Sequence, residues 1–466
     1  MNDASPLGLT ALTPKLLAKY DRPGPRYTSY PTAPLFHPGF DEAAYRERLA
    51  VASKSADAPL SMYVHIPFCE ARCTYCGCNI VISPHRGPEE RYLDAVEQEL
   101  DHLAASLGPR HQLNQLHWGG GTPTYLTPAQ CERLFGAITA RFQLTADAEV
   151  AIEVDPCVTS MEHLETLRGL GFNRLSMGVQ DLDRTVQEAV RRVQPLELSR
   201  GHAEAARRLG FSSVNVDLIY GLPYQHETQF RDTVRTVIRE LAPDRVACFS
   251  YAHVPWIKPH QRQLDESTLP RGWEKFRLFV GAAEEFTAAG YRFVGFDHFA
   301  RPGDELARAL DEGRLHRNFM GYTVMPASDQ VGIGVTSIGD VAGAYVANEK
   351  NLARYQRAVT DGRLPVERGI ARSREDELRG GVIRRLICTL KLDFAWVEST
   401  YGVDPREHFA DALAELRGMA DDGLVAIRDD GLAVTPLGRF FLRNLCMPFD
   451  AYLKQPSDKP VFSRTV

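Results

Sequence analysis

Residues 69–78 read Cys69-Glu70-Ala71-Arg72-Cys73-Thr74-Tyr75-Cys76-Gly77-Cys78, with three cysteines at C-x3-C-x2-C spacing and a fourth after a glycine. The preceding run, Met62-Tyr63-Val64-His65-Ile66-Pro67-Phe68, is apolar and rich in β-forming residues. This pattern predicts a strand whose carboxyl end opens into the cysteine loop. Thiolates packed so closely favour a shared metal centre.

Two kinds of metal centre fit this loop. A zinc ion prefers four tetrahedral ligands, and Cys78 or His65 could supply the fourth. An iron–sulfur cluster held by three thiolates instead leaves one iron open, where a substrate or cofactor can bind. The spacing favours the cluster over zinc, and it favours either metal centre over four unrelated free cysteines.

A glycine loop follows the next predicted strand, in His117-Trp118-Gly119-Gly120-Gly121-Thr122-Pro123-Thr124. Its glycines expose backbone N–H and C=O groups, but it lacks the lysine of a P-loop and the spacing of a dinucleotide fingerprint. Taken together with residues 65–79, this loop resembles the radical S-adenosylmethionine (SAM) superfamily and, within it, the oxygen-independent coproporphyrinogen III oxidase (dehydrogenase) family. The resemblance extends over nearly the whole chain.

The resemblance implies the cofactors and the reaction. In the superfamily three cysteines, here Cys69, Cys73 and Cys76, hold a 4Fe–4S cluster whose unique iron is chelated by the amino and carboxylate groups of SAM. In the family, a 5′-deoxyadenosyl radical made from SAM starts the oxidative decarboxylation of two propionates of coproporphyrinogen III to vinyl groups, giving protoporphyrinogen IX for haem synthesis. The electron donor is expected to be a protein such as a flavodoxin or ferredoxin.

The resemblance also assigns residues to two SAM molecules. The SAM on the cluster would be contacted by Tyr63, Gly120, Glu153 and Ile338. The second SAM would be contacted by Tyr75, Gly121, Thr122, Gln180, Arg192, Asp217 and Ala252. Cys78 stands where related haem chaperones have an aromatic residue, and it is a candidate substrate contact rather than a cluster ligand.

The residues alone support part of this assignment. Glu153, Gln180 and Asp217 stand at the carboxyl ends of predicted strands, where barrel enzymes carry their chemistry. A carboxylate there is not expected to be buried unpaired, so Glu153 either accepts a group of SAM or belongs to a salt bridge at the rim. Arg192 either binds a SAM carboxylate through its planar fork or is a solvated helix charge.

Residues 1–58 are predicted to form an N-terminal arm. The prolines of Arg22–Thr32 exclude a helix and predict an extended or turning segment,. This segment is either a surface arm or a flap whose Arg22 and Arg26 contact an acidic substrate. The related haem chaperones lack the arm, so its presence favours the enzyme. A haem-binding chaperone without porphyrinogen turnover, and a radical SAM enzyme acting on another tetrapyrrole, stay as alternatives.

Strands and helices alternate over the middle of the chain. Six strands are predicted, at 61–67, 115–119, 149–155, 174–179, 213–220 and 245–251,. Amphipathic helices are predicted between them, at 90–107, 127–142, 160–171, 181–193 with 198–210, and 227–241,. Six βα units imply an α/β fold with a parallel sheet and helices outside. The pattern does not separate an open doubly wound sheet from a barrel, whereas the resemblance implies a partial (β/α)6 TIM-like barrel in a domain at 59–360.

The stretch 255–350 is less regular. A helix is predicted over 271–290, ended by a glycine,. His298 and Arg301, with residues 316–319, lie in predicted loops and are candidates to bind substrate carboxylates,. Ion pairs between loops are the alternative for each of them.

A small, mostly helical domain is predicted at 361–466. Helices over 375–392 and 409–419, a hairpin over 424–435 and a further helix from Pro436 resemble a winged helix,. Winged helices often bind DNA, but a fold alone does not assign a function, and the acidic chain carries no nucleic-acid footprint.

Composition excludes several classes of protein. The 466 residues are 44% hydrophobic and 24% charged with a net charge of −6, which is typical of a soluble globular protein,. No run approaches the roughly 18 apolar residues of a membrane span, and Met1–Leu17 lacks a signal-peptide pattern. Of the nine cysteines, five are scattered singly, which indicates a reducing compartment, the cytoplasm, rather than a disulfide frame. The absence of heptads favours a monomer.

Overall fold

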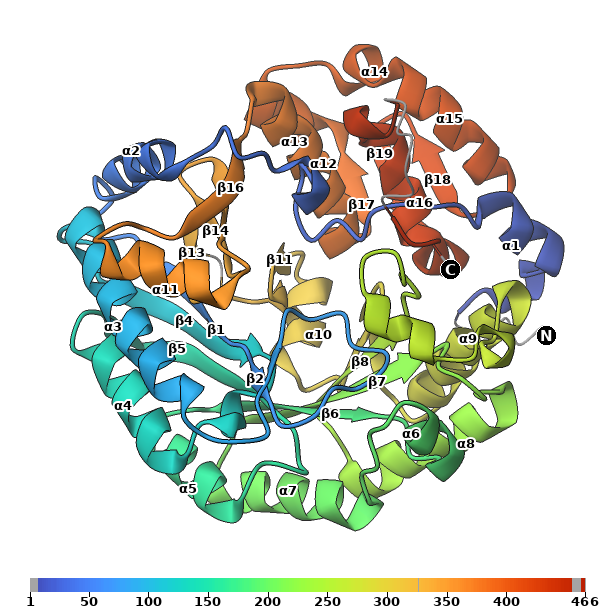
Figure 1. Cartoon of the computed structure of the whole chain (residues 1–466). Coiled ribbons are helices and arrows are strands. Elements are labelled where there is room, and N and C mark those ends of the chain that lie inside the picture. The colour runs from blue at the N-terminus through green and yellow to red at the C-terminus, as the bar shows by residue number, and fades with distance from the viewer. Residues whose placement is uncertain (1–6, 326, 455–461, 466) are drawn as a thin grey trace.

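A computed structural model of the chain describes residues 7–325, 327–454 and 462–465. Its centre is a curved twelve-stranded sheet with helices on the outer side (Figure 1). The six predicted strands are confirmed as parallel neighbours in chain order: β1 (Leu60–Ile66), β4 (Gln112–Gly120), β5 (Gln143–Val154), β6 (Arg174–Gln180), β7 (Ser213–Tyr220) and β8 (Arg245–Ser250). Their carboxyl ends therefore meet along one side of the sheet.

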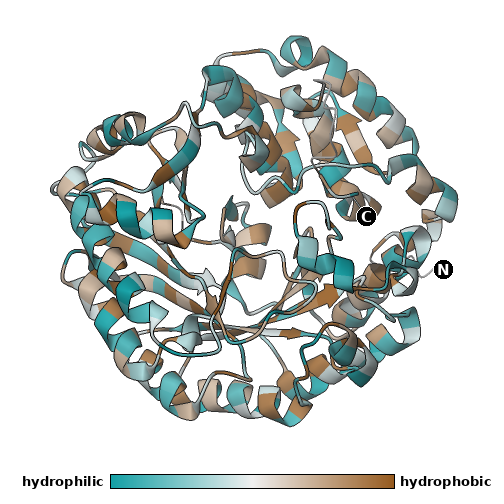
Figure 2. Ribbon diagram, in the orientation of Figure 1, coloured by the Kyte–Doolittle hydropathy of each residue, from teal (hydrophilic) through white to brown (hydrophobic). Residues whose placement is uncertain are grey.

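The outer helices confirm the predicted alternation. They are α3 (Pro88–Leu107), α4 (Pro128–Thr139), α5 (Met161–Leu170), α6 (Arg184–Ala189) with α7 (Leu196–Leu209), and α8 (Glu227–Thr236). Capping boxes fix two of the starts, Thr127 with Gln130 at α4 and Ser160 with His163 at α5,. Figure 2 shows hydrophilic and hydrophobic residues mixed on each outer helix, as expected where one face packs on a sheet.

The sheet extends beyond the six predicted strands on both sides. Next to β1 come the parallel β13 (Asp329–Ile333) and then the antiparallel β14 (Ile338–Val341), β15 (Ala344–Asn348) and β16 (Val366–Ala371). Next to β8 come β10 (His298–Ala300) and β9 (Arg292–Gly295), also antiparallel. Within the described residues the sheet ends at β16 and β9. The strand β16 belongs to this sheet although it lies past residue 360, where the predicted C-terminal domain begins. The division of the chain at residues 58 and 360 stays a prediction.

The rest of this part of the chain forms further helices and a hairpin. These are α9 (Gly272–Ala288), α10 (Glu305–Asp311), the hairpin of β11 (His316–Asn318) and β12 (Gly321–Thr323), and α11 (Leu352–Thr360). The cysteine loop lies between the short paired strands β2 (Phe68–Cys69) and β3 (Val81–Ile82). The helix predicted over 271–290 is confirmed as α9. None of the described helices is both long and apolar enough to cross a membrane.

The N-terminal region is packed against the body rather than forming an arm throughout. It contains two helices, α1 (Pro14–Tyr20) and α2 (Glu42–Ala52). Between them, the predicted extended segment buries Tyr27 and Tyr30, which are 5% and 4% exposed. The Tyr27 hydroxyl donates to Asp450 Oδ2 (3.1 Å), and the Tyr30 hydroxyl accepts from the Ala451 N–H (3.0 Å). The interpretation as a free surface arm is therefore wrong.

The C-terminal part contains the predicted helices and hairpin and several further elements. The predicted ones are α12 (Arg374–Thr389), α15 (Ala410–Asp421), β18 (Val425–Arg428) and β19 (Gly431–Val434), and the additional ones are β17 (Lys391–Asp393), α13 (Phe394–Tyr401), α14 (Pro405–His408) and α16 (Leu442–Cys446). The helix predicted to reach residue 392 ends earlier because Leu390 is left-handed, with φ 59°, and β17 begins at the next residue. The predicted helix after Pro436 is a 3-10 segment (Leu437–Phe441) followed by α16.

Candidate active site

A cavity of about 430 Å³, here called the cofactor cavity, lies at the carboxyl ends of the parallel strands. Most of the predicted site residues line it: Cys69, Cys73, Tyr75, Cys76, Cys78, Gly120, Gly121, Thr122, Glu153, Gln180, Arg192, Asp217 and Ala252, with Arg26 from the N-terminal segment. They come from strand ends far apart in the sequence. The common direction of parallel strands brings them together.

The cysteine loop and the glycine loop are joined by backbone contacts. The Gly121 N–H donates to the Ile66 carbonyl (2.8 Å), and the Thr122 N–H donates to the Phe68 carbonyl (2.9 Å). A Cβ on Gly121 would lie 2.6 Å from the Pro67 carbonyl oxygen. Any side chain there would push the two loops apart, so glycine at this position fixes one wall of the cavity.

The thiols of the cysteine loop lie in different electrostatic surroundings. Burial raises the pKa of Cys69 to about 11. Burial also raises the pKa of Cys73, although the Arg192 guanidinium opposes the shift. The pKa of Cys76 is lowered because the Cys78 thiol and N–H donate hydrogen bonds to its sulfur. A metal centre bound here would displace protons from the buried thiols.

The three cysteines that a cluster would need are brought to one cavity. Within the described part of the chain, no three His, Cys, Asp or Glu side chains converge tightly enough to hold one metal ion. Cys69, Cys73 and Cys76 nevertheless line the same cavity. Thiolates of an iron–sulfur cluster bind different irons, so they stand farther apart than the ligands of one zinc ion. His65, a candidate fourth zinc ligand, already uses both ring nitrogens on protein oxygens at 3.0 and 3.1 Å.

Glu153 presents a charged carboxylate to the cavity from the end of β5. It accepts hydrogen bonds from the His117 ring (3.4 Å) and the Gly120 N–H (3.2 Å). Burial alone would raise the pKa of Glu153, but these two donors outweigh it and hold the pKa below its ordinary value. The side chain keeps 45% of its surface accessible. Glu153 can therefore accept a cationic or hydroxyl group of a bound molecule.

Asp217, on β7, is a second carboxylate in the same cavity. It accepts from the Asn215 amide (2.7 Å) and the Ser176 hydroxyl (3.4 Å). Burial, and then the charge of Glu153, raise the pKa of Asp217 to about 7. A positive group placed near both carboxylates would remove this repulsion and favour the charged form.

Arg192 lies in the loop after α6 and forms a largely buried ion pair, so its interpretation as a solvated helix charge is wrong. Its Nη1 lies 2.6 Å from Asp155 Oδ2, and the two side chains are 13% and 17% exposed. Its Nη2 donates to the Gly178 carbonyl (2.9 Å), while its Nε is buried without a partner among the described residues. Asp155 was not singled out from the sequence, although its place at the end of a strand could have identified it.

Three predicted site residues are not brought into the cavity. The Tyr63 hydroxyl bonds the His65 ring (3.1 Å), and Ile338 packs in a cluster beside β15. Arg22 lies 3.3 Å from Glu415 of α15, and it lines neither the cofactor cavity nor the two cavities next to it. The geometry therefore does not support Arg22 as a substrate contact, because a carboxylate of the C-terminal part holds it elsewhere.

A segment without a recognisable motif supports the cysteine loop from the opposite side. Three of its side chains bond backbone carbonyls of the loop: Lys258 to Cys78 (3.1 Å), His260 to Cys76 (2.8 Å) and Gln261 to Tyr75 (2.9 Å). No sequence signal could have identified these residues, because they lie in an irregular stretch and act only through contacts distant in sequence.

Comparison with known proteins gives matches along the whole chain. The family model described as the Radical SAM superfamily matches residues 63–237, and that of the HemN C-terminal domain matches residues 373–441. The chain is 46% identical over 451 residues to the oxygen-independent coproporphyrinogen III oxidase of Salmonella typhimurium, with 97% of this chain and 98% of the relative covered. It is 40% identical over 455 residues to the protein of that name from Helicobacter pylori, with 96% and 98% covered.

The structure also matches a solved one. Coproporphyrinogen III oxidase (HemN) from Escherichia coli, described as a radical SAM enzyme, superposes with a TM-score of 0.87 at 45% sequence identity. The match covers 92% of this chain and 97% of that chain. The similarity thus applies to the whole fold and not only to the cysteine motif.

Proposed function

The chain belongs to the oxygen-independent coproporphyrinogen III oxidase family, and from this premise we propose that it converts coproporphyrinogen III to protoporphyrinogen IX. In this reaction each of two propionate side chains loses carbon dioxide, one proton and two electrons and becomes a vinyl group. The observation that carries the proposal is the cavity that gathers three cysteines and a glycine loop at the ends of parallel strands.

The cofactors follow from the superfamily. A radical SAM enzyme uses a 4Fe–4S cluster and SAM, and Cys69, Cys73 and Cys76 are the residues that would hold the cluster. When bound, the cluster and SAM supply a carbon radical that can remove a hydrogen atom from a substrate C–H bond. Cys78 remains outside this ligand set and faces the cavity, where we assign it to the substrate side.

The side chains of the cofactor cavity can bind a molecule that carries both positive and negative groups. Glu153 and Asp217 can accept the ammonium and sulfonium charges of SAM, and the buried Arg192–Asp155 pair presents an N–H to a carboxylate,. We propose two SAM sites. The first would use Gly120 and Glu153 of the cofactor cavity, together with Tyr63 and Ile338, which lie outside that cavity in this structure. The second would use Tyr75, Gly121, Thr122, Gln180, Arg192, Asp217 and Ala252.

Arg26 closes the cavity from the N-terminal segment. Its guanidinium donates to the Ser250 carbonyl (2.5 Å) at the end of β8, and it lines the cofactor cavity and the cavity beside it. A cation at this junction can hold an anionic substrate near the cofactors and can help to exclude water. We propose Arg26 as a substrate contact.

The experiment that tests the function uses anaerobically reconstituted protein. We expect SAM turnover and release of carbon dioxide from coproporphyrinogen III, and we expect the electron paramagnetic resonance spectrum of the reduced cluster to shift when SAM is added. A haem chaperone would instead bind haem tightly and leave coproporphyrinogen unchanged. An intact cluster with neither turnover nor carbon dioxide release would defeat the proposal.

The partner and the setting of the enzyme are part of the proposal. A small electron-transfer protein such as a flavodoxin or ferredoxin would supply the reducing electron, and the enzyme would work as a cytoplasmic monomer. Reconstitution of turnover with a purified flavodoxin in place of dithionite tests the first statement, and the mass in solution tests the second.

A further inference from the structure

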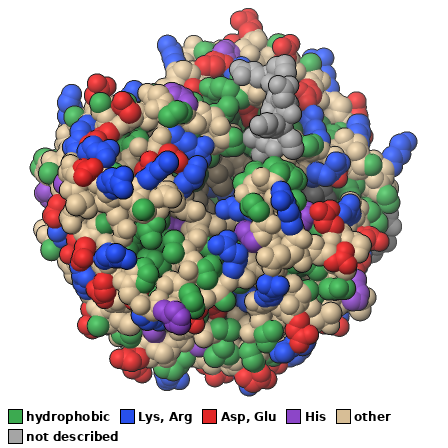
Figure 3. Space-filling view, in the orientation of Figure 1, with side chains coloured by type: hydrophobic (Ala, Val, Ile, Leu, Met, Phe, Trp, Pro, Cys, Tyr) green, Lys and Arg blue, Asp and Glu red, His purple; other side chains and the backbone are tan. Residues whose placement is uncertain are grey.

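Two more cavities adjoin the cofactor cavity in series. The middle cavity, about 240 Å³, shares with the cofactor cavity the residues Arg26, Phe249 and Ser250. The third, about 190 Å³ and here called the arginine cavity, shares with the middle cavity the residues Thr28, Arg317 and Phe319. Figure 3 shows this face of the molecule hollowed near its centre, with Lys and Arg side chains around the hollow. An elongated or broad anionic ligand could thus extend from the cofactors into the arginine cavity.

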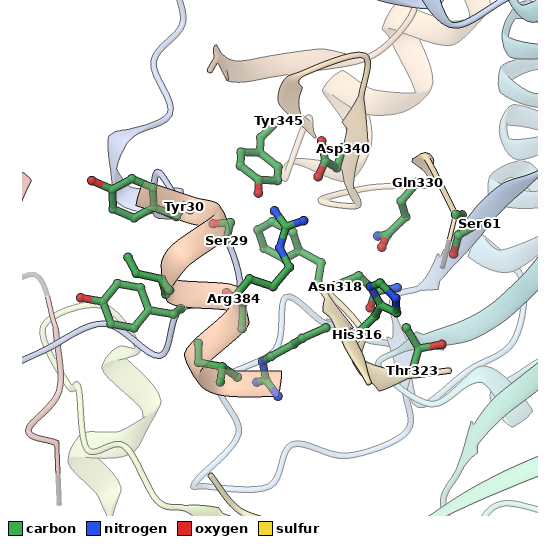
Figure 4. A pocket seen from close by; sticks show the side chains of 18 of the residues that line it. Ser29, Tyr30, Ser61, His316, Asn318, Thr323, Gln330, Asp340, Tyr345 and Arg384 are labelled. Carbon is green, nitrogen blue, oxygen red and sulfur yellow. The ribbon is translucent and has the colours of Figure 1, made fainter. Parts of the chain in front are cut away.

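The arginine cavity is walled by several separate parts of the chain (Figure 4). They are the N-terminal segment 27–30, Ser61 of β1, the hairpin of β11 and β12 with residues 325, 327 and 328 after it, the strands β13 to β15, and the helix α12. The charged and titratable side chains that face it from these parts are His316, Arg317, Asp340, Arg372, Glu377 and Arg384. Cations therefore outnumber carboxylates on its walls.

Both carboxylates of the arginine cavity are ion-paired with the same arginine. Arg372 lies 2.5 Å from Asp340 and 3.0 Å from Glu377. Arg384 extends from α12 into the cavity (Figure 4) and makes no ion pair or hydrogen bond within the described residues. Its charge is consequently available to a ligand.

Arg317 is a second cation with unused donors, and it is held in a fixed position. Its guanidinium lies over the rings of Phe296 (5.0 Å) and Tyr322 (4.7 Å). Its Nε and Nη1 are buried, and neither has a hydrogen-bond partner in the described part of the chain. The carboxylate of Asp297, which lines the neighbouring middle cavity, is paired with His298 (2.7 Å). Buried N–H groups without partners are unfavourable, so this arrangement favours a bound anion.

The other arginines of the middle cavity have backbone partners. Their acceptors are carbonyl oxygens, with Arg26 donating to Ser250, Arg439 to Phe293 and Arg443 to Pro25. Arg301, which the sequence made a candidate for binding carboxylates, likewise donates to the Pro243 carbonyl (3.0 Å) and lines none of the three cavities. Arg317 and Arg384 differ from these arginines because, within the described residues, their guanidinium groups make no hydrogen bond or ion pair.

We propose that Arg317 and Arg384 bind the carboxylates of the porphyrinogen propionates that are not undergoing reaction. This inference rests on the proposed function. A propionate being decarboxylated must lie in the cofactor cavity, so the remaining carboxylates of the four lie elsewhere on the rim of the macrocycle. A guanidinium binds a carboxylate through two parallel hydrogen bonds, and such contacts would fix which propionate faces the cofactors.

The test measures binding of stable porphyrins to the anaerobically reconstituted protein by quenching of porphyrin fluorescence. Arg384→Gln and Arg317→Gln should each weaken the binding of coproporphyrin III by at least about tenfold, the loss expected for a charge-assisted pair of hydrogen bonds. Binding of its tetramethyl ester, which carries no carboxylate, should not change between wild type and variants. Arg385→Gln is the matched control, because Arg385 follows on α12 but lies over Trp396 (5.0 Å) and lines none of the three cavities.

Iron content and dithionite-driven SAM cleavage without substrate should equal those of wild type in both variants, and KM for coproporphyrinogen III should rise more than kcat falls. Equal affinity of wild type and Arg384→Gln for coproporphyrin III would overturn the inference. If Arg317→Gln does not fold, the binding measurement on Arg384→Gln is sufficient to test the inference. The proposed function is judged separately, by carbon dioxide release from the wild type. If the wild type releases no carbon dioxide but the variants still lose porphyrin binding, the carboxylate site is supported and the proposed function is wrong.

Discussion

The cofactor cavity and the arginine cavity are assembled by different means. The first is formed by the cysteine loop and by the carboxyl ends of the parallel strands β4 to β8. The second takes its walls from the N-terminal segment, the strands beside β1, a short hairpin and a C-terminal helix. A rigid sheet thus positions the groups for radical chemistry, whereas packing between distant segments positions the groups for the substrate. Variants in the two cavities should therefore fail in different ways.

The largest effect is expected in the cysteine loop. Cys73→Ala removes one of three thiolates that would hold the cluster, so iron binding and decarboxylation should both fall below detection. Cys78→Ser should keep the iron, because Cys78 is not in the proposed ligand set, and should lose decarboxylation. Iron and sulfide content, together with the resonance spectrum of the reduced protein, distinguish the two. Loss of iron in Cys78→Ser would restore a fully ligated cluster or zinc as the better interpretation.

The contrast between the cavities also explains what the sequence could and could not predict. The cysteine spacing, the glycine loop and the strand periodicity are local signals, and parallel strands bring Glu153, Gln180 and Asp217 to one place by their polarity alone,. The pairing of Arg192 with Asp155 depends on a contact between the loop after α6 and the end of β5, which no local pattern specifies. Arg384 gave no signal, because a single arginine on an amphipathic helix is ordinary and its importance depends on walls supplied by segments far away in the chain.

A smaller effect is expected at Arg192. Arg192→Lys keeps the charge but loses the planar fork that bonds both Asp155 and Gly178. We expect SAM affinity to fall by roughly 10- to 100-fold, since one or two charge-assisted hydrogen bonds are lost, with iron content unchanged. Calorimetric titration of SAM measures this directly. The affinity of the variant for coproporphyrin III serves as the control. An equal loss of porphyrin affinity would mean that the two cavities do not act separately.

Asp217 should show a pH dependence of opposite sign for stability and for binding. Its pKa is raised from 3.8 to about 7, so the folded state binds the proton more tightly, and the free energy of unfolding falls as pH rises through this range. Asp217→Asn should therefore be more stable than wild type at pH 8, by about 1–2 kcal/mol after discounting for partial exposure. This difference should vanish toward pH 4. Denaturant titrations at the two pH values measure it.

The same variant should bind SAM more weakly. An ionised Asp217 attracts the positive groups of SAM, so wild-type affinity should increase as pH rises through about 7,. Asp217→Asn should lose roughly tenfold in affinity at pH 8 and should show a flatter pH profile. An unchanged profile in the variant would assign the wild-type pH dependence to another group.

The smallest effect is expected where the N-terminal segment meets the C-terminal part. Tyr27→Phe removes the hydrogen bond to Asp450 (3.1 Å) and should lower the free energy of unfolding by about 1 kcal/mol. Tyr27 also lines the arginine cavity but not the cofactor cavity. Loosening the segment should raise KM for coproporphyrinogen III a few-fold, by about the same free energy, and leave SAM affinity as in wild type. Within the described residues, Tyr27 bonds Asp450 and does not line the cofactor cavity. A change in SAM affinity equal to the change in KM would therefore falsify the separation of the two cavities.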